Sequence, residues 1–318
     1  MRVRFWGTRG SIPVGLTAAD VRDKLARALV AASGKRFDSY GDAYAFAEQH
    51  LPSSISHTFG GHTSCVELDT GHDEYFVCDM GSGARAFGEH VLARQSGKPA
   101  TVNIFMSHVH WDHIMGFPFF GPAYVRGMRI RIYGSHDILE KAFRLQQSAP
   151  CFPVVFDHLA ATIEFRKLVP GEPTEVSGLK VTTQLQRHSG DSYGYRFEHD
   201  GRSVVYTTDS EHKLGDRADR DRAAAFFRDA DLVIFDAMYS LAEAISVKED
   251  WGHSSNVMGV ELCQAARAKH LVLFHHEPAN NDAAIEGALR DARRLEELTR
   301  GEHALRVSAA HDGLEIDL

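Results

Sequence analysis

Three features are missing from this sequence: a long apolar run, a block of basic residues and a closely spaced pair of cysteines. No apolar stretch approaches the roughly 18 residues that a helix needs to cross a bilayer. The opening MRVRFWG alternates like a strand and does not resemble a signal peptide. We therefore expect a cytoplasmic protein without a membrane partner. The four cysteines form no CxxC pair, which excludes a disulfide framework and predicts reduced, mostly buried thiols.

The charge of the chain is acidic and evenly mixed. The 35 Lys and Arg residues and the 43 Asp and Glu residues give a formal net charge of −8 and are interspersed along the 318 residues. Without a basic stripe, the chain lacks a surface that would neutralise a long nucleic-acid backbone, so we expect no long nucleic acid as a partner. A small anionic substrate would instead need metal ions or a few local cations. Assembly into a homo-oligomer stays open.

Short apolar runs rich in Val, Ile and Phe alternate with helical patterns, which predicts one layered α/β domain over residues 1–318. The 43% hydrophobic content supports a sizeable core. Many runs end in Asp, Ser or His, as expected of a sheet that delivers polar groups to a cleft at its edge. We predict strands at 3–6, 65–69, 75–79, 101–107, 129–134, 179–185, 194–198, 203–209, 232–236 and 271–275, and helices at about 84–95, 136–148, 222–229, 255–268 and 282–299.

Residues 15–58 look like an insertion into this pattern. Thr17 and Asp20 match a capping box that begins a helix, and a second short helix is predicted around 41–50. An apolar stripe runs along the first helix and consists of Val21, Leu25, Ala28, Leu29 and Ala32. Two alternatives stay open for this insertion: a packed helical decoration of the domain, or a lid beside the active site.

The most informative string is SHVHWDHIMG at residues 107–116. It follows an apolar run, so it lies on the loop and helix start where a strand ends. Alternation places His108 and His110 on the same side of the extended segment, while the following turn carries Asp112 and His113 to a second point. A lone histidine is usually a satisfied polar residue, but four ligand-type side chains at these spacings predict a site for two metal ions.

More side chains of metal-ligand type lie at the ends of later apolar runs. His188 follows LKVTTQLQR, Asp209 ends SVVYTTD and His275 ends LVLFH, with His276 as a competitor for the last place. Histidine-rich sites that share a carboxylate suit zinc, and manganese or iron are alternatives by ligand type. The sequence therefore predicts two divalent metal ions, with zinc preferred.

With these residues, the chain resembles the metallo-β-lactamase superfamily, in the branch of ribonuclease Z and the cyclic phosphate hydrolases. The segments FWGTRGSIP, FGGHTSCVELD, VCDMGSG and AHDGLEIDL resemble further parts of that branch. The resemblance covers the chain apart from 15–58. It implies an αββα four-layer sandwich, with two mixed sheets, helices on the outer faces and the metal site at one edge of the sheets.

The resemblance also implies how the ligands divide. The first ion takes His108, His110 and His188, the second takes Asp112, His113 and His275, and Asp209 bridges them. His275 is favoured over His276 because the family's ligand directly ends the apolar strand. Asp79 matches an early aspartate that sits beneath the metal loop in the family and anchors it; the alternative is a simple turn-starting residue before Gly81.

The string DWGHSSN at 250–256 contains a histidine without an evident packing role. In ribonuclease Z-like proteins, a histidine of a His-Ser-Thr motif, paired with an acid at the end of an earlier strand, is associated with proton transfer near the leaving group. His253 and Asp236 match those positions, although Asp stands in place of Glu and Ser255 in place of Thr. The alternative is a solvent-facing histidine ahead of a capped helix.

The function that the resemblance implies is a binuclear metal-dependent hydrolase, and the preferred reaction is cleavage of a small or cyclic nucleotide-like phosphodiester. Hydroxide held between the two metal ions would attack phosphorus, and His253 with Asp236 would assist the leaving group. We count Asp112 among the catalytic residues as well as the ligands. Arg9, in the glycine-flanked loop GTRGS, is a candidate for a contact with the substrate phosphate.

Other classes compete with this interpretation. Hydrolysis of a carboxylic ester, thioester or lactone uses the same kind of metal site but needs neither the GHSS motif nor Asp236. Processing of tRNA is less favoured, because ribonuclease Z commonly carries a tRNA-gripping arm where 20 residues separate His188 from Asp209 here. His110 disfavours the flavodiiron-type oxidoreductases, which normally have an acidic residue at that position. The complete ligand set disfavours a binding protein without activity.

Overall fold

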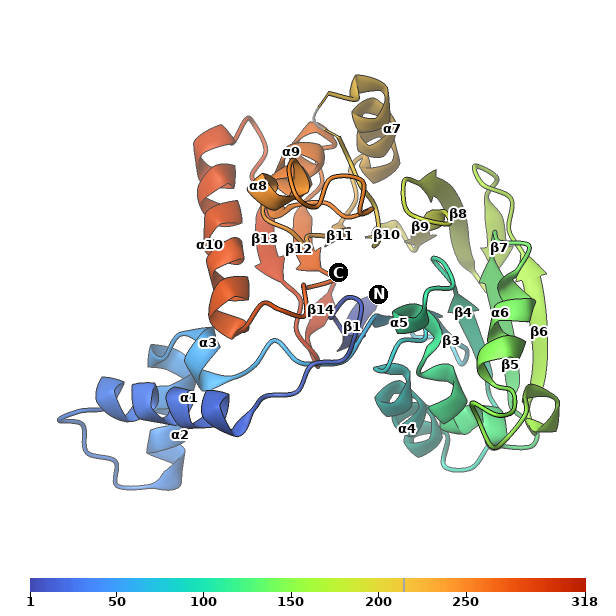
Figure 1. Ribbon diagram of the computed structural model, residues 1–318, viewed down its shortest axis with the longest axis horizontal. Helices are drawn as coiled ribbons and strands as arrows, with labels where there is room; N and C mark the ends of the chain where they lie inside the picture. The colour runs from blue at the N-terminus through green and yellow to red at the C-terminus, as the bar shows by residue number, and fades with distance from the viewer. Residues whose placement is uncertain (214) are drawn as a thin grey trace.

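Two stacked β-sheets form the core of the computed structural model, which describes residues 1–213 and 215–318 (Figure 1). The first sheet has the strand order β14-β1-β2-β3-β4-β5-β6, with parallel pairing from β3 to β6 and antiparallel pairing elsewhere. Its strands are β1 (Arg2–Gly7), β2 (Cys65–Asp69), β3 (Tyr75–Cys78), β4 (Thr101–Phe105), β5 (Arg129–Gly134), β6 (Thr162–Lys167) and β14 (Glu315–Asp317).

The second sheet has the order β13-β12-β11-β10-β9-β8-β7 and is also mixed. Neighbouring strands from β10 to β13 pair in parallel. The pairs β7–β8, β8–β9 and β9–β10 are antiparallel. Its strands are β7 (Thr174–Val176), β8 (Leu179–Gln186), β9 (Ser192–His199), β10 (Arg202–Thr207), β11 (Leu232–Asp236), β12 (His270–Phe274) and β13 (Arg306–Ala309). Each sheet therefore has a parallel half, and parallel strands bring their carboxyl ends to one edge.

Helices flank both sheets, and short 3₁₀ turns connect some of them. The helices are α1 (Ala18–Ala31), α2 (Tyr40–His50), α3 (Ser53–Ser56), α4 (Ala84–Gln95), α5 (Trp111–Ile114), α6 (Leu139–Gln146), α7 (Arg217–Phe227), α8 (Leu241–Ala244), α9 (Asn256–Ala265) and α10 (Asp282–Thr299). The 3₁₀ turns are η1 (Phe117–Phe119), η2 (Gly121–Tyr124) and η3 (Phe156–His158).

Three apolar layers hold these elements together and confirm the predicted αββα sandwich. The central layer lies between the sheets and includes Phe105 of the first sheet and Phe274 of the second. One outer layer packs α4 and α6 on the first sheet, and the other packs α7, α9 and α10 on the second. Strand β11 shows why its run LVIF is continuously apolar: Ile234 faces the central layer, while Phe235 faces the outer one.

The strands that the apolar runs did not predict lie at the edges of the sheets. Strands β6, β7, β13 and β14 end their sheets, and each carries charged or half-exposed residues, as in TIEFRK at 162–167. An edge strand is covered less completely, so its sequence lacks a continuous apolar run. Helix α7 begins at Arg217, where Asp216 caps it, and not at 222 as predicted. Its first turn is charged, so the apolar pattern did not reveal it.

The insertion at 15–58 forms helices α1 to α3, and Figure 1 shows α1 and α2 extending away from the two sheets. The capping box of Thr17 and Asp20 is present. The insertion is attached through α3 beside α10, and the Lys24 ammonium forms an ion pair with Asp282 at 2.6 Å. The predicted apolar stripe is not packed: the side chains of Val21 and Leu29 are 53% and 65% exposed. The apolar stripe of α1 is therefore exposed, although α1 does contact α3 within the insertion.

The structure bears on two expectations, the absence of a membrane-spanning helix and the state of the cysteines. None of the helices in the described ranges is long and apolar enough to span a membrane. The four cysteines lie within those ranges as free thiols, three of them buried and Cys151 exposed.

A buried histidine in β12 makes stability depend on pH. His270 is 5% exposed and its Nε2 lies 2.8 Å from Ser308 Oγ, and burial together with Arg306 and Arg293 lowers its pKa from 6.5 to about 4. The unfolded chain binds this proton near pH 6.5 and the folded chain does not, so unfolding takes up a proton and stability falls as the pH decreases. Between pH 6.5 and 5, the free energy of unfolding of the wild type should fall by about 1–2 kcal/mol more than that of His270→Gln, measured by urea unfolding at both pH values. Equal losses in both proteins would contradict this assignment.

Candidate metal centre

The loop after β4 is held from below by a buried carboxylate. Asp79 accepts hydrogen bonds from the Ser107 backbone N–H and hydroxyl at 2.8 and 2.7 Å, and from the Tyr206 hydroxyl at 2.7 Å. It also accepts from His113 Nδ1 at 2.8 Å, which directs His113 Nε2 away from it. Asp79 therefore lies beneath the loop that carries the histidine motif and fixes both the backbone of this loop and one of its rings.

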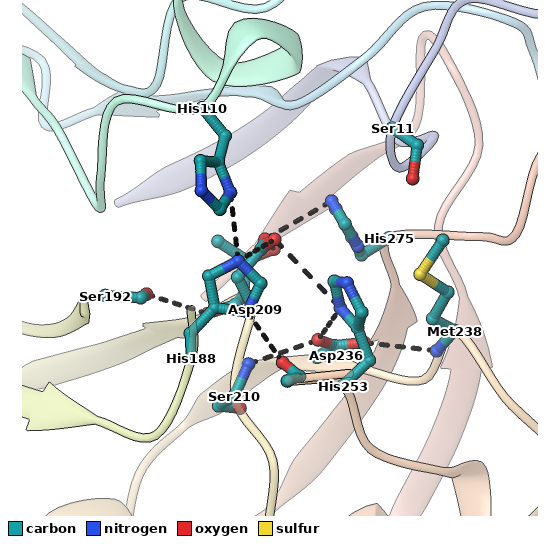
Figure 2. A network of polar contacts seen from close by, with 12 residues as sticks. Ser11, His110, His188, Ser192, Asp209, Ser210, Asp236, Met238, His253 and His275 are labelled. Atoms are coloured by element: carbon teal, nitrogen blue, oxygen red, sulfur yellow. Dashed lines mark hydrogen bonds and ion pairs between the residues drawn. The ribbon is translucent and has the colours of Figure 1, made fainter. Parts of the chain in front are cut away.

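The first cluster gathers side chains from the loop after β4 and the end of β8. His108, His110 and His188 place ring nitrogens within 4.8 Å of one another, and His188 Nε2 lies 3.1 Å from His110 Nδ1. Asp209 Oδ2 lies 3.7 Å from His108 Nε2 and 3.5 Å from His188 Nε2. Figure 2 shows His110, His188 and Asp209 converging on the same space.

The second cluster consists of Asp112, His113 and His275. The Nε2 atoms of His113 and His275 face each other at 3.3 Å, and Asp112 Oδ2 is 3.2 Å from the first and 3.4 Å from the second. Asp209 contributes its other oxygen here, because Oδ1 lies 3.1 Å from His113 Nε2 and 3.2 Å from His275 Nε2. One carboxylate thus faces both clusters, an oxygen to each.

Several side chains of the site begin at strand ends with an unusual backbone. Asp79 directly follows β3, Asp209 lies two residues after the end of β10, and His275 directly follows β12. All three adopt left-handed backbone conformations, with φ values of 58°, 50° and 58°. Such conformations cost about 1–3 kcal/mol each for residues other than glycine and persist where the surrounding structure enforces them. The turns at Asp209 and His275 direct these side chains into the centre, and the turn at Asp79 directs its carboxylate beneath the loop.

Burial and charge set the protonation of the clusters. Burial lowers the pKa of His108, His110 and His188, which favours neutral imidazoles. At the second cluster burial opposes protonation of His113, but the charges of Asp209, Asp112 and Asp79 outweigh it and raise the pKa of this ring. The carboxylates thus attract positive charge to the space between them and the histidines.

The donor set suits divalent metal ions. His108 Nε2 is buried and has no hydrogen-bond partner among the residues that the structure describes. The facing Nε2 atoms of His113 and His275 would repel each other through their lone pairs unless a proton or a cation lies between them. Neutral imidazole nitrogens and ionised carboxylate oxygens at this spacing are the ligands that zinc and similar ions take in proteins.

His253 lies beside both clusters and is paired with Asp236. Its ring stacks on His275 with centroids 5.1 Å apart, and its Nδ1 donates to Asp236 Oδ2 at 2.8 Å (Figure 2). Asp236 is itself held by the backbone N–H groups of Ser210 and Met238. His253 is 9% exposed, so the solvent-facing alternative is wrong, while Ser255 does cap helix α9.

The environment of His253 favours its protonated form. Burial opposes protonation, but the charge and hydrogen bond of Asp236 outweigh it and, with Asp209 and Asp112, raise the His253 pKa to about 9. The ring also lines a cavity of about 810 Å³ together with polar residues such as Arg187 and apolar ones such as Met258. A volume of this size accommodates a small organic group.

Two other predicted residues lie apart from the clusters. His276 Nε2 donates to the Ala310 carbonyl at 2.8 Å, so His275 is the member of the pair that faces the centre. Arg9 is buried and donates to the backbone carbonyls of Gly60, Glu277 and Asn280. These bonds brace the N-terminal loop, and we propose no substrate contact for Arg9.

Two backbone groups that residue types did not reveal position the ligands. The Gly252 carbonyl accepts from His188 Nδ1 at 2.9 Å, and the Ser11 N–H donates to Asp112 Oδ2 at 2.8 Å. Both belong to strings that had already been singled out, GTRGS and DWGHSSN. Main-chain contacts between distant segments leave no mark in residue type, except that Gly252 has a left-handed φ of 84°.

Comparison with known proteins decides the family. A profile described as a beta-lactamase superfamily domain matches residues 68–276, a range that contains every member of both clusters. The chain belongs to this superfamily. With its histidine and aspartate clusters, this β-lactamase superfamily protein is a metal-dependent hydrolase.

Individual relatives of this superfamily protein are distant. Ribonuclease Z of Thermoplasma acidophilum is 25% identical over 236 residues, which cover 60% of this chain and 74% of that protein. The metallo-β-lactamase fold protein YhfI of Bacillus subtilis has a TM-score of 0.65 and 16% identity, covering 99% of this chain and 98% of its own. A diphosphatase of the PhnP family has a TM-score of 0.57 and 19% identity, covering 100% and 97%. The structural likenesses show the shared fold.

Two glycines next to the clusters test the positions of the ligands. A Cβ on Gly10 would lie 2.6 Å from the His275 ring, and one on Gly252 would lie 2.3 Å from His188 Nδ1. We expect Gly10→Ala and Gly252→Ala each to displace one ligand and to lower the metal-to-protein ratio by about one ion, measured by elemental analysis. Gly15→Ala is the matched control, because a Cβ there meets nothing within 4 Å. Wild-type metal content in both variants would contradict the assignment.

Proposed function

We propose that the chain is a binuclear metal-dependent phosphodiesterase that cleaves a small or cyclic nucleotide-like diester. The observation that carries this proposal is the pairing of His253 with Asp236 immediately beside the two ligand clusters. A generic metallohydrolase needs the clusters alone. A phosphodiesterase also gains from a proton donor for the departing alkoxide, which is a poor leaving group.

The proposed ligand sets follow the distances around Asp209. The first ion would be held by His108, His110 and His188, the second by Asp112, His113 and His275, and Asp209 would bridge them through its two oxygens. Zinc is the preferred ion for this histidine-rich set, with manganese or iron as alternatives. When bound, two such ions supply positive charge for the phosphoryl oxygens and acidify a water molecule.

The chain itself orients the ligands before any substrate arrives. The Gly252 carbonyl can only accept, so His188 Nδ1 carries the proton and its Nε2 lone pair points to the first cluster. Asp79 does the same for His113 at the second cluster. Fixed tautomers of this kind raise the affinity of a histidine for a metal ion and hold the rings in place.

His253 is placed to deliver a proton through Nε2. Because Nδ1 donates to Asp236, the second nitrogen is the one that can reach a substrate atom. The cavity lined by His253, Ser254 and Met258 gives the departing group of the diester a place beside this ring. The leaving alkoxide would therefore take its proton from His253 as the bond to phosphorus breaks.

Substitution of the pair separates proton transfer from metal binding. We expect His253→Ala to lower kcat for an alkyl phosphodiester by about 10²–10⁴-fold while the metal content stays at the wild-type level, because general acid catalysis contributes on that scale. Asp236→Asn should lower kcat in the same direction by removing the charge that favours the protonated ring. His270→Gln serves as the matched control, since it changes a buried histidine of the same sheet away from the clusters.

The metal content decides between two roles for His253. His253 belongs to two further groups whose side chains could together hold a metal ion. One group adds His188 and Asp209, and the other adds Asp236 and His275. Loss of an ion in His253→Ala would make His253 a ligand and contradict the proton-transfer role. Persistent turnover with both ions bound would contradict it as well.

Processing of tRNA is the second candidate, and the relatives favour it more than the sequence pattern did. Proteins named ribonuclease Z are 22–25% identical to this chain. The segment from His188 to Asp209 contains the short hairpin of β9 and β10. The protruding insertion at 15–58 holds five Lys and Arg and five Asp and Glu residues, a formal balance of zero. Such a neutral arm offers little attraction to an RNA backbone.

A substrate panel distinguishes the reaction classes. We expect the zinc-loaded protein to hydrolyse bis(p-nitrophenyl) phosphate and cyclic nucleotides, measured by absorbance and chromatography. A tRNA precursor should be cleaved at least about tenfold less efficiently, because a chain with a formal net charge of −8 attracts an RNA backbone weakly. Rapid turnover of a lactone or thioester without diester turnover would overturn the proposal, and efficient 3′ processing of the tRNA precursor would favour the second candidate.

A further inference from the structure

Two of the three tryptophans lie exposed next to the candidate metal ligands. Trp111 is 71% exposed and Trp251 is 58% exposed, while Trp6 donates to Glu67 and packs against Phe87. Single exposed aromatic residues are normal on protein surfaces, so exposure by itself indicates nothing. What distinguishes Trp111 and Trp251 is how firmly the backbone holds them beside the clusters.

Trp111 stands between two proposed ligands. It is the first residue of α5, with His110 before it and Asp112 after it, and its carbonyl accepts from the Met115 N–H at 2.7 Å. Asp112 is fixed in turn by the Ser11 N–H at 2.8 Å. The indole therefore leaves the chain at a point that cannot shift without moving a ligand.

Trp251 is held by a buried carboxylate. Glu211 accepts from the backbone N–H groups on both sides of it, those of Asp250 at 3.1 Å and Gly252 at 3.2 Å. Asp250 and Gly252 adopt left-handed φ values of 65° and 84°, so Trp251 stands at the tip of a tight turn. The Lys248 ammonium lies over the indole of Trp251, 4.8 Å from its centroid, and occupies one of its two faces.

A short chain of contacts joins the two tryptophans through the first cluster. His110, which precedes Trp111, lies 3.1 Å from His188 through their ring nitrogens. His188 in turn donates to the carbonyl of Gly252, which follows Trp251. The backbone positions of both tryptophans are therefore anchored to the same histidine pair, and we call Trp111 and Trp251 the aromatic rim.

We propose that the aromatic rim stacks the base of the substrate, which makes the substrate class a nucleoside phosphodiester. Rigid indoles offer faces on which any nucleobase stacks, and this recognition needs no basic track along a nucleic-acid backbone. In an acyclic diester the departing arm lies beside His253, and the arm that stays on phosphorus carries the base to the rim; in a cyclic nucleotide the same nucleoside holds both ester oxygens. This inference rests on the proposed phosphodiesterase function.

Tryptophan fluorescence tests base binding without relying on turnover. Adenosine 5′-monophosphate should quench the metal-loaded protein, whereas ribose 5-phosphate, which has the same phosphate and no base, should not. The double variant Trp111→Phe/Trp251→Phe retains Trp6 and should show no quenching by the nucleotide. Equal responses to the two probes in the wild type, or quenching that persists in the double variant, would overturn the proposal.

Two synthetic diesters with the same leaving group test the effect on catalysis. Thymidine 5′-(p-nitrophenyl) phosphate and methyl p-nitrophenyl phosphate differ only in the retained arm. We expect Trp111→Ala and Trp251→Ala to raise KM for the nucleoside diester about 10–100-fold relative to KM for the methyl diester, as expected for loss of one stacked base. Metal analysis of each variant separates a lost ion from a lost stacking face.

The control and the outcomes keep the two proposals apart. Tyr40→Ala removes an aromatic side chain that is 83% exposed on α2 and should leave the KM ratio of the two diesters unchanged. An unchanged ratio in both tryptophan variants would overturn the role of the aromatic rim while leaving the phosphodiesterase function intact. Absence of turnover with every diester would overturn the proposed function, and the fluorescence result would still decide base binding.

Discussion

The arrangement of the centre depends on one buried carboxylate. Asp209 lies 2% exposed with one oxygen directed to each cluster, and its contacts include histidines from the loop after β4, the end of β8 and the end of β12. Burial opposes its ionisation, but His275, His113 and His108 outweigh this and hold the Asp209 pKa well below its ordinary value. An ionised carboxylate at that depth is stable only with positive charge around it, so the centre is built to hold cations.

Around Asp209 the fold supplies a layer of groups that fix its neighbours. Asp79, the Gly252 carbonyl and Asp236 each accept a hydrogen bond from a histidine Nδ1, and each thereby determines where Nε2 of that ring points. The three histidines, His113, His188 and His253, differ in position but share this device. It converts a set of polar side chains into a preorganised site, in which little reorganisation is required when a substrate binds.

The same constraint extends to the rim of the site. Glu211 holds the turn of Trp251 through its neighbours, and the same turn supplies the carbonyl that orients His188. Substrate recognition at Trp251 and metal coordination at His188 would therefore share one rigid segment. A side chain added at Gly252 would therefore affect both metal coordination and substrate recognition. Loops positioned by a rigid scaffold commonly carry function in this way.

Much of the molecule was predictable from residue types. Apolar runs located the central strands, because strands covered on both faces leave a continuous hydrophobic signal, and the edge strands β6, β7 and β13 leave none. The histidine motif and the strand-end residues Asp209 and His275 were predicted as a metal site, and the resemblance implied the partnership of His253 with Asp236. The apolar stripe of α1 left two alternatives open, since periodicity shows that a face is apolar and not whether anything covers it.

By itself, then, the sequence determined a layered α/β domain, the residue types of the centre and their order along the chain, and its resemblance to the superfamily implied the αββα sandwich. The tertiary structure alone decided that His275 faces the clusters while its neighbour His276 bonds to Ala310, and that Arg9 braces backbone carbonyls. It also decided which backbone groups orient the histidines and where the two exposed tryptophans are anchored. The physical reason is that these choices depend on the direction of a side chain at a strand end, which is set by contacts between segments far apart in the sequence.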